Sequence, residues 1–479
     1  MKIKEPHDFF YINQFSEGAG LKGAIDVKTA NLIVKYFNND INKEIRYIKI
    51  NDEYLSICGI GCDITNINFG VTNYSNEKVN ISFEPPNILY ISVKNIRGWG
   101  RFSLFFKMLL IGYNENISFD INNINVNATF LISSKQEKGR KLPFAILYNL
   151  LYNYDFDFNL SSSIGNIITL FKSELKSIIR KRIDKLINQK IEEGLQIGLS
   201  MIPNEIIVDQ KKGYVIDYSL ISDPVIQNNY ILFNSYARLI NKNIKETQII
   251  NNFVLPFSIP SYDLIGKSSQ IYISDYVINT ALFTFFKTRD LEILITPEML
   301  PEQLPLIKLN TSWLGLIFKN ISDVYGMDQP VNIRLIVCEN PQLILKEDLV
   351  SFILPTNVEV IVKGFEGIAV KFRTTFFVDA IFNILENFKI TGSIKNLNIQ
   401  NTKIIWAFAE DDNFVNNLEK NFNFLKGLAL PFINNYVLNN INYTLPVIRG
   451  IKFADMTISH HENFIIVNYN FLFNPNEIL

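Results

Sequence analysis

The sequence predicts an α+β fold in which one unit of helices and antiparallel strands is present twice. Two helical patterns of apolar residues begin near residues 27 and 275, and each is followed by segments in which apolar and polar residues alternate. A second long helical pattern starts about 139 residues after the first helix and about 138 residues after the helix at 275. A repeated unit this rich in apolar side chains can build two barrels, each plugged by helices, and such barrels often hold ligands.

The composition is that of a globular protein with more than one core. The chain has 479 residues, of which 48% are hydrophobic and 19% charged, and its 38 Phe and 21 Tyr suit strands. A net charge of −1 gives no electrostatic reason to expect a nucleic-acid partner. No apolar run approaches the ~18 residues of a spanning helix. The first residues, MKIKEPHDFFYINQF, lack the apolar segment of a signal peptide.

The first half of the chain is predicted to open with a helix that Asp26 caps. Ala30, Ile33, Val34 and Phe37 recur there at helical spacing. The second long helix of this half carries seven basic and two acidic residues across 172–190. The expected elements are a polar lead-in (1–20), a short strand (20–25), a helix (27–45), antiparallel strands (48–132), a charged loop (133–142), a strand region to about 160 and a long helix (164–195).

The two halves are expected to share the segment 203–260, in which turn residues separate three short strands. The second half then repeats the order of the first, and Pro431 is expected to kink its long helix. The predicted elements are strands at 205–208, 214–220 and 230–239, a helix at 275–286, strands from 291, a short helix at 312–325, alternating strands at 331–337 and 358–362, a long helix at about 412–440, and strands at 450–458 and 463–473.

The cysteines do not predict a disulfide framework. Cys58 and Cys62 are four residues apart, which separates them by roughly 13 Å on an extended strand, whereas a disulfide needs Cα atoms within about 7 Å. They are therefore unpaired unless Gly59 and Gly61 fold this run back on itself. No further ligands cluster nearby to make a metal site.

Histidines are too few and too badly placed for a catalytic triad or a zinc site. His460 and His461 are adjacent, so on a strand they face opposite ways, and His7 is the third. We therefore expect no catalytic residues, no metal and no enzymatic activity.

Four stretches resemble the bactericidal/permeability-increasing protein family, which includes lipopolysaccharide-binding protein and the plasma phospholipid and cholesteryl-ester transfer proteins. The first helix and its exit, IDVKTANLIVKYFNNDINKEIRYIKIND, are similar to the opening of that family. GYVIDYSLISDPV resembles its central segment, and IYISDYVINTALFTFF followed by LEILIT resembles the entry to its second barrel. LPFINNYVLNNINYTLPVIRGIKFADMTISHHENFIIVNYNFLF resembles its last helix and strands. The resemblance covers about residues 20–475, in the same order.

The resemblance implies an elongated boomerang of two barrel-plus-helix domains joined by a central antiparallel β-sheet, with apolar tunnels for lipid acyl chains. It implies binding and transfer rather than covalent chemistry, bound phospholipid rather than a cofactor, lipids and membrane surfaces as partners, and secretion or an endomembrane lumen. The absence of a visible signal peptide leaves a cytoplasmic location open. The implied segments are 1–20 (lead-in), 21–202 (first barrel), 203–262 (central sheet and linker) and 263–479 (second barrel, with closing strands returning to the central sheet).

Two departures from the family are visible. The animal members share a disulfide, but the matching neighbourhoods around Ala145 and Ile191 contain no cysteine. The lipopolysaccharide-binding members have a strongly basic tip on the first barrel, where this chain retains only Arg97, Arg101 and Lys107. Recognition of a polyanionic glycolipid is therefore in doubt.

Candidate site residues follow from the apolar helix faces and the basic segments. The helix faces line either a lipid tunnel or an ordinary core, since both need the same side chains. The basic stretch 172–190 and the loop 135–141 touch anionic headgroups or form a solvated face. The glycine-rich segment 97–101 is either a tip that dips into a membrane or an ordinary hairpin turn. The lipid candidates are Ile33, Phe37, Ile41, Ile179, Ile183, Leu186, Ile278, Leu282 and Phe285, and the headgroup or membrane candidates are Arg97, Trp99, Arg101 and Lys107.

The sequence thus predicts a protein that binds and transfers lipid of the phospholipid type. One alternative is antimicrobial binding of bacterial envelope lipid such as lipopolysaccharide. Another, from a different class, is a structural or interaction protein that reuses the fold with packed barrels.

Overall fold

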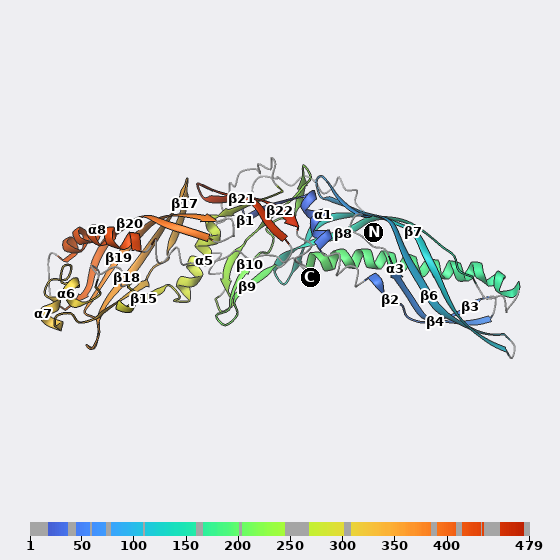
Figure 1. Cartoon of the computed structure of the whole chain (residues 1–479), viewed down its shortest axis with the longest axis horizontal. Helices are drawn as coiled ribbons and strands as arrows, with labels where there is room; N and C mark the ends of the chain where they lie inside the picture. The colour runs from blue at the N-terminus through green and yellow to red at the C-terminus, as the bar shows by residue number, and fades with distance from the viewer. Residues whose placement is uncertain are drawn as a thin grey trace.

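The computed structural model is an elongated body with a curled sheet at each end and a further sheet between them (Figure 1). All strand pairs in the described residues are antiparallel. The structure describes residues 18–36, 45–57, 60–72, 78–108, 111–159, 166–200, 204–244, 268–300, 308–384, 390–408, 414–432, 434 and 451–473.

The elements of the first half begin with a strand and a helix that follow one another directly. They are β1 (Leu21–Asp26), α1 (Val27–Tyr36), β2 (Ile48–Lys49), β3 (Glu53–Ile57), β4 (Ile60–Val71), β5 (Val79–Glu84), β6 (Ile88–Met108), β7 (Ile111–Glu137), β8 (Arg140–Phe156), α3 (Asn166–Ser200), β9 (Glu205–Asp209), β10 (Tyr214–Asp217), β11 (Val225–Gln227), β12 (Tyr230–Ser235) and β13 (Arg238–Asn241).

The second half repeats this opening. Its elements are β14 (Ser269–Ser274), α5 (Asp275–Lys287), β15 (Glu292–Ile295), the 3₁₀ turn η4 (Pro297–Met299), α6 (Thr311–Leu314), α7 (Ile321–Tyr325), β16 (Val331–Val337), β17 (Gln342–Lys346), β18 (Leu349–Val362), β19 (Val370–Ile384), β20 (Ile390–Ala407), α8 (Phe414–Phe432), β21 (Ile451–His461) and β22 (Phe464–Phe473).

The two end sheets have the same strand order. The first is β2-β4-β6-β7-β8 with β5 added on β6, and the second is β15-β16-β18-β19-β20 with β17 added on β18. In both, the short added strand pairs with the first part of the long strand, and its neighbour pairs with the second part. The long helices α3 and α8 begin 139 residues after α1 and α5, since 166 − 27 and 414 − 275 are equal. The predicted duplication is confirmed.

The central sheet is symmetric about the pair β1–β14. Its order is β11-β12-β1-β14-β22-β21, so each half contributes one strand before its first helix and a closing hairpin. The offset between the halves is 248 residues (275 − 27), and Gly23 pairs with Ile271, which is its own equivalent at this offset. The approximate two-fold axis therefore passes through this pair. A Cβ on Gly23 would overlap the Phe233 ring, so the centre of the sheet requires glycine.

Each first helix is attached to its end sheet by one asparagine. Asn31 of α1 donates from Nδ2 to the carbonyl of Ile81 (3.0 Å) and accepts from the N–H of Ile81 (2.9 Å). Asn279 of α5, which is 248 residues later, makes the same two bonds to Leu343, at 2.9 and 2.7 Å. Both amides satisfy the outer edge of a short strand, β5 or β17, which would otherwise keep unpaired backbone groups.

A small third sheet, β13-β10-β9, carries a network of charges. Asp217 and Arg238 are almost fully buried, and the guanidinium binds Oδ2 of Asp217 at 2.9 and 3.0 Å. Arg140 of β8 binds Glu205 at 2.6 Å, and Lys242 binds the other oxygen of Glu205 at 2.6 Å. Lys242 and then Arg140 lower the pKa of Glu205. The network connects the first end sheet to the small sheet.

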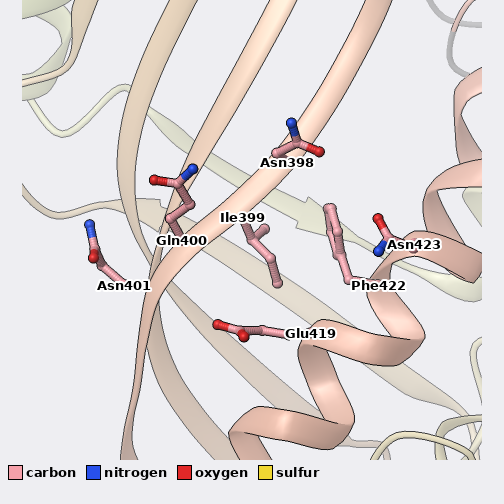
Figure 2. A pocket seen from close by; sticks show the side chains of 7 residues that line it. All are labelled: Asn398, Ile399, Gln400, Asn401, Glu419, Phe422 and Asn423. Atoms are coloured by element: carbon pink, nitrogen blue, oxygen red, sulfur yellow. The ribbon is translucent and has the colours of Figure 1, made fainter.

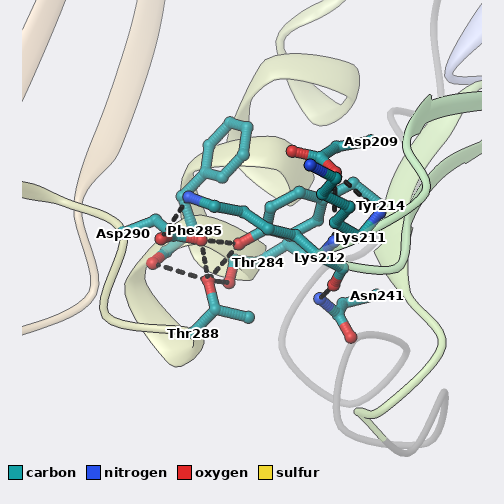
Figure 3. Close-up of polar contacts among 9 residues, drawn as sticks. All are labelled: Asp209, Lys211, Lys212, Tyr214, Asn241, Thr284, Phe285, Thr288 and Asp290. Carbon is teal, nitrogen blue, oxygen red and sulfur yellow. Dashed lines mark hydrogen bonds and ion pairs between the residues drawn. The ribbon is translucent and has the colours of Figure 1, made fainter.

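The hairpin between β9 and β10 contacts the end of α5 (Figure 3). Lys212 binds Asp290 at 2.8 Å, and the Tyr214 hydroxyl bonds to both Asp290 and Thr288. Burial and the bond to Asp290 raise the pKa of Tyr214 to about 12, while Lys212 and Tyr214 lower the pKa of Asp290. The small sheet is thus joined to the helix that opens the second half.

Several predicted elements match the structure closely. The Asp26 cap is confirmed, because its Oδ1 accepts from the N–H of Thr29 at 2.7 Å. The helix at 275–286, the strand at 331–337 and the final strand pair are also confirmed. The long helices include 164–195 largely as expected, and Pro431 lies inside α8.

Other predicted boundaries are wrong. The charged loop 133–142 is two strand ends joined by a turn at Lys138 and Gly139, because its charged side chains lie on a wet hairpin. The strand at 230–239 breaks at Ala237, whose φ of 47° does not continue a strand. The short helix at 312–325 is two helices, α6 and α7, since Asn320 has a positive φ between them. The limits of the four predicted segments of the chain remain a prediction.

The run containing two of the cysteines does fold back. Ile57 of β3 pairs with Ile60 of β4, so the extended geometry expected between positions 58 and 62 is wrong. Cys62 is buried, and Cys58 lies outside the described residues, as do the lead-in 1–17 and Pro256 and Pro260.

The asparagine attachments predict a specific loss of stability. Asn31→Ala and Asn279→Ala should each lower the free energy of unfolding by about 1–3 kcal/mol, because each leaves a strand N–H and C=O without a partner. Urea denaturation followed by circular dichroism measures this. Lys28→Ala, an exposed change on α1, is the control and should have little effect. Losses below those of Lys28→Ala at both sites would contradict the assigned role of the amides.

Candidate functional site

The long helix α3 lies along the first curled sheet with one apolar stripe turned toward it (Figure 1). Leu175, Ile179 and Ile183 are buried against strands β4, β6, β7 and β8. Further along the helix, Leu195 and Leu199 pack with a second group that adjoins α1 and the central sheet. From 175 to 199 the stripe extends ~36 Å at ~1.5 Å per residue. The first half therefore has an apolar interior as long as most of its helix.

Aromatic rings fill the far part of this interior. Phe119 lies 5.3 Å from Phe156, 5.9 Å from Phe158 and 6.2 Å from Phe102 between ring centroids. Such distances are typical of favourable edge and offset ring contacts. The sequence prediction missed this group, although the alternation of 154, 156 and 158 on one strand face could have indicated it.

Polar groups lie at the side of the same helix. The Tyr154 hydroxyl donates to Asp184 at 2.7 Å, and burial followed by this carboxylate raises the pKa of Tyr154 well above its ordinary value. Arg180 lies over the Tyr154 ring at 5.3 Å. The interior is therefore closed laterally by a paired hydroxyl and a stacked cation.

The predicted lipid-lining residues are only partly brought together. Ile179, Ile183 and Leu186 share the α3 stripe, and Ile278 and Leu282 pack in a second group against β17 and β18. Phe285 is separate from that group, because its ring contacts Tyr214 at 5.1 Å. Ile33 lies in α1, but its side chain is outside the described residues, as are Phe37 and Ile41 entirely.

The basic stretch of α3 is partly neutralised by its own domain. Lys172 and Lys176 bind Asp157 at 3.2 and 3.5 Å, and Lys190 binds Glu193 at 3.0 Å. Lys181 and Lys185 are exposed. Both sequence-based interpretations, headgroup contact and solvated face, thus apply to a smaller set of charges than the seven counted.

The predicted membrane residues do not form a tip or a hairpin turn. Arg97, Trp99 and Arg101 lie in the middle of strand β6, and Lys107 is six residues further along it, ~20 Å away. Arg101 lies 5.5 Å from the Trp99 ring and 5.6 Å from the exposed ring of Tyr47. Neighbouring Phe102 and Leu104 are buried, so this group is on the outer face of the sheet.

The glycines of this segment explain the wrong prediction. Gly100 is a strand residue whose Cβ would overlap the Phe119 ring, so glycine is needed for close packing rather than for a turn.

Catalytic and metal-binding groups do not gather in the described residues. No cluster of three or more His, Cys, Asp or Glu side chains is present there. His461 stacks on Phe464 with centroids 5.0 Å apart, and burial lowers the pKa of the half-buried His460. In the described part, no helix is both long enough and apolar enough to cross a membrane.

The symmetric central sheet and the two curled sheets define the class of a duplicated barrel-and-helix protein. The family model of the LBP / BPI / CETP C-terminal domain matches residues 207–473. The chain belongs to the LBP/BPI/CETP family, whose members bind and transfer lipids. No curated protein matches the chain.

Three solved structures are similar over nearly the whole length. A lipopolysaccharide binding protein is 18% identical with a TM-score of 0.47, and the match covers 95% of this chain and 100% of that one. P47 from Clostridium botulinum A2 is 14% identical with a TM-score of 0.29, covering 95% and 97%. P47 of Clostridium botulinum E1 is 12% identical with a TM-score of 0.27, covering 95% and 99%.

The α3 stripe predicts different costs for a packed core and for a lined cavity. Ile179 is fully buried, so Ile179→Ala should lower the free energy of unfolding by about 2–5 kcal/mol. Chemical denaturation of the purified protein measures this, with the exposed Ile146→Ala of β8 as the control. A cost below about 1 kcal/mol would mean that Ile179 faces open space rather than packed side chains.

Proposed function

We propose that the protein binds and transfers lipid, with acyl chains of the phospholipid type held in the apolar interior of each half. The observation that carries the proposal is the unbroken apolar stripe of α3 inside a curled sheet. Membership in a family of lipid-binding and transfer proteins supports it. Burial of an acyl chain gains about 0.8 kcal/mol per methylene, so such an interior extracts lipid without covalent chemistry.

The same family membership supports secretion, or residence in an endomembrane lumen, as the location in which this protein acts. Its partners would be lipids and membrane surfaces, and no cofactor is needed.

Organic extraction of natively purified protein, followed by lipid mass spectrometry, tests the proposal. We expect phospholipid-type lipid in stoichiometric amounts. Leu186→Trp should retain less lipid than wild type, because a larger side chain from α3 occupies interior volume. Lys185→Trp, at an exposed neighbouring position, should retain the wild-type amount. An empty extract together with no uptake from labelled vesicles would overturn the proposal and favour an interaction protein with packed barrels.

Membrane contact is proposed for the outer-face group of Tyr47, Trp99 and Arg101. An aromatic pair that holds a guanidinium suits the interface, where rings and cations are both favourable. Arg97 and Lys107 lie on the same strand and would add charge at its two ends.

Vesicle flotation tests this contact. Trp99→Ala and Arg101→Ala should each weaken binding to phosphatidylcholine–phosphatidylserine vesicles by about two- to fivefold, the size of one exposed cation–π contact. Lys94→Ala, an exposed change on the same strand, is the control. Equal binding by all three variants would remove this surface from the proposal.

A further inference from the structure

A pocket of about 510 Å³ lies between strand β20 and helix α8 in the second half (Figure 2). Its volume is within the ~300–1,000 Å³ that small-molecule sites occupy. The strand supplies Asn398, Ile399, Gln400 and Asn401, and the helix supplies Glu419, Phe422 and Asn423.

The floor of the pocket is apolar and fixed. Ile399 packs against the core of the second half, and the Phe422 ring lies 6.4 Å from the Phe376 ring. Figure 2 shows Ile399 and Phe422 side by side between the strand and the helix, with polar side chains around them. Both side chains are half-buried, so each still offers part of its surface to a ligand.

Polar bonds on either side hold the helix against the strand. Lys426 of α8 donates to Asn396 (2.6 Å) and to Oδ1 of Asn398 (3.0 Å). Beyond it, the amide of Asn434 makes two bonds with the backbone of Ile394, at 2.7 and 2.9 Å. These contacts fix the distance between the two elements, and they orient the carboxamide of Asn398. The pocket is therefore formed before any ligand arrives.

The lining favours a neutral ligand. Four carboxamides and one carboxylate surround the floor, and the seven lining residues of the described chain include no lysine or arginine. Glu419 would repel a phosphate, and an acyl chain would leave the amides without hydrogen-bond partners. A carboxamide offers both donors and acceptors, which match hydroxyl groups that also do both.

We propose that this pocket binds a neutral saccharide of one or two rings. Adjacent hydroxyls of the sugar would bond to the amides and to Glu419, while its C–H face would pack on the Phe422 ring. The ligand chemistry is shared by free glycans and by glycolipid headgroups. The proposal does not depend on lipid in the α3 interior, because the pocket lies in the other half of the chain.

Titration calorimetry of the full-length protein with D-glucose, D-galactose and N-acetyl-D-glucosamine tests the proposal. We expect saturable binding of at least one sugar, weakened about fivefold or more by Glu419→Ala and by Asn423→Ala, because each removes a hydrogen bond from a mostly enclosed ligand. Asn416→Ala, an exposed change on the same helix outside the pocket, should bind as wild type does. Matched thermal unfolding of all variants separates loss of binding from loss of folding.

A second arm identifies the source of the sugar. Phosphatidylcholine vesicles with and without a monohexosyl glycolipid are compared by flotation. Glycolipid-dependent binding that Glu419→Ala reduces supports a headgroup, and binding of free sugar alone supports a soluble glycan. The proposal is overturned if neither probe binds, if Glu419→Ala and Asn423→Ala leave binding unchanged, or if inorganic phosphate binds at this site instead. Lipid found by extraction has no bearing on these outcomes, so the two proposals fail separately.

Discussion

The hydrogen-bond ladder between β1 and β14 is the constraint on which the rest of the structure depends. It pairs the strand that opens the first half with the strand that opens the second, centred on Gly23 and Ile271. Each strand runs directly into a helix, α1 or α5, so the ladder also fixes where these helices start. Each helix then positions an end sheet through its asparagine. Strand pairing at one point thus determines the placement of both ends, with the geometry of an isologous dimer interface within one chain.

The two halves share this plan but differ in what their long helices can do. The α3 helix has 35 residues and an apolar stripe facing its sheet, whereas α8 has 19 described residues and leaves a polar pocket beside β20. Duplication therefore preserved the connections between elements while the surfaces between helix and sheet diverged. Fold and binding chemistry are separable in this way because the backbone ladders do not depend on which side chains line a gap.

The sequence predicted the parts of the fold that periodicity and helix-capping signals determine. The stripe of α3, the cap at Asp26 and the equal spacing of the helices all follow from local patterns. The segment around Trp99 was misjudged, because glycine signals a turn and close packing equally well, and the Phe119 ring that decides between them is distant in sequence. The α8–β20 pocket could not be predicted for a related reason. Its amides are scattered in an asparagine-rich chain, and only the register of strand against helix brings them together.

The paired bonds of Asn31 and Asn279 have a consequence for behaviour in concentrated solution. Strands β5 and β17 each pair with one long strand, so their other edges are potential templates for a strand from another molecule. At each edge an asparagine amide from the adjacent helix occupies one donor and one acceptor. The same helix then stands where an incoming strand would have to lie. The residue that docks each helix thereby also protects the sheet from aggregation.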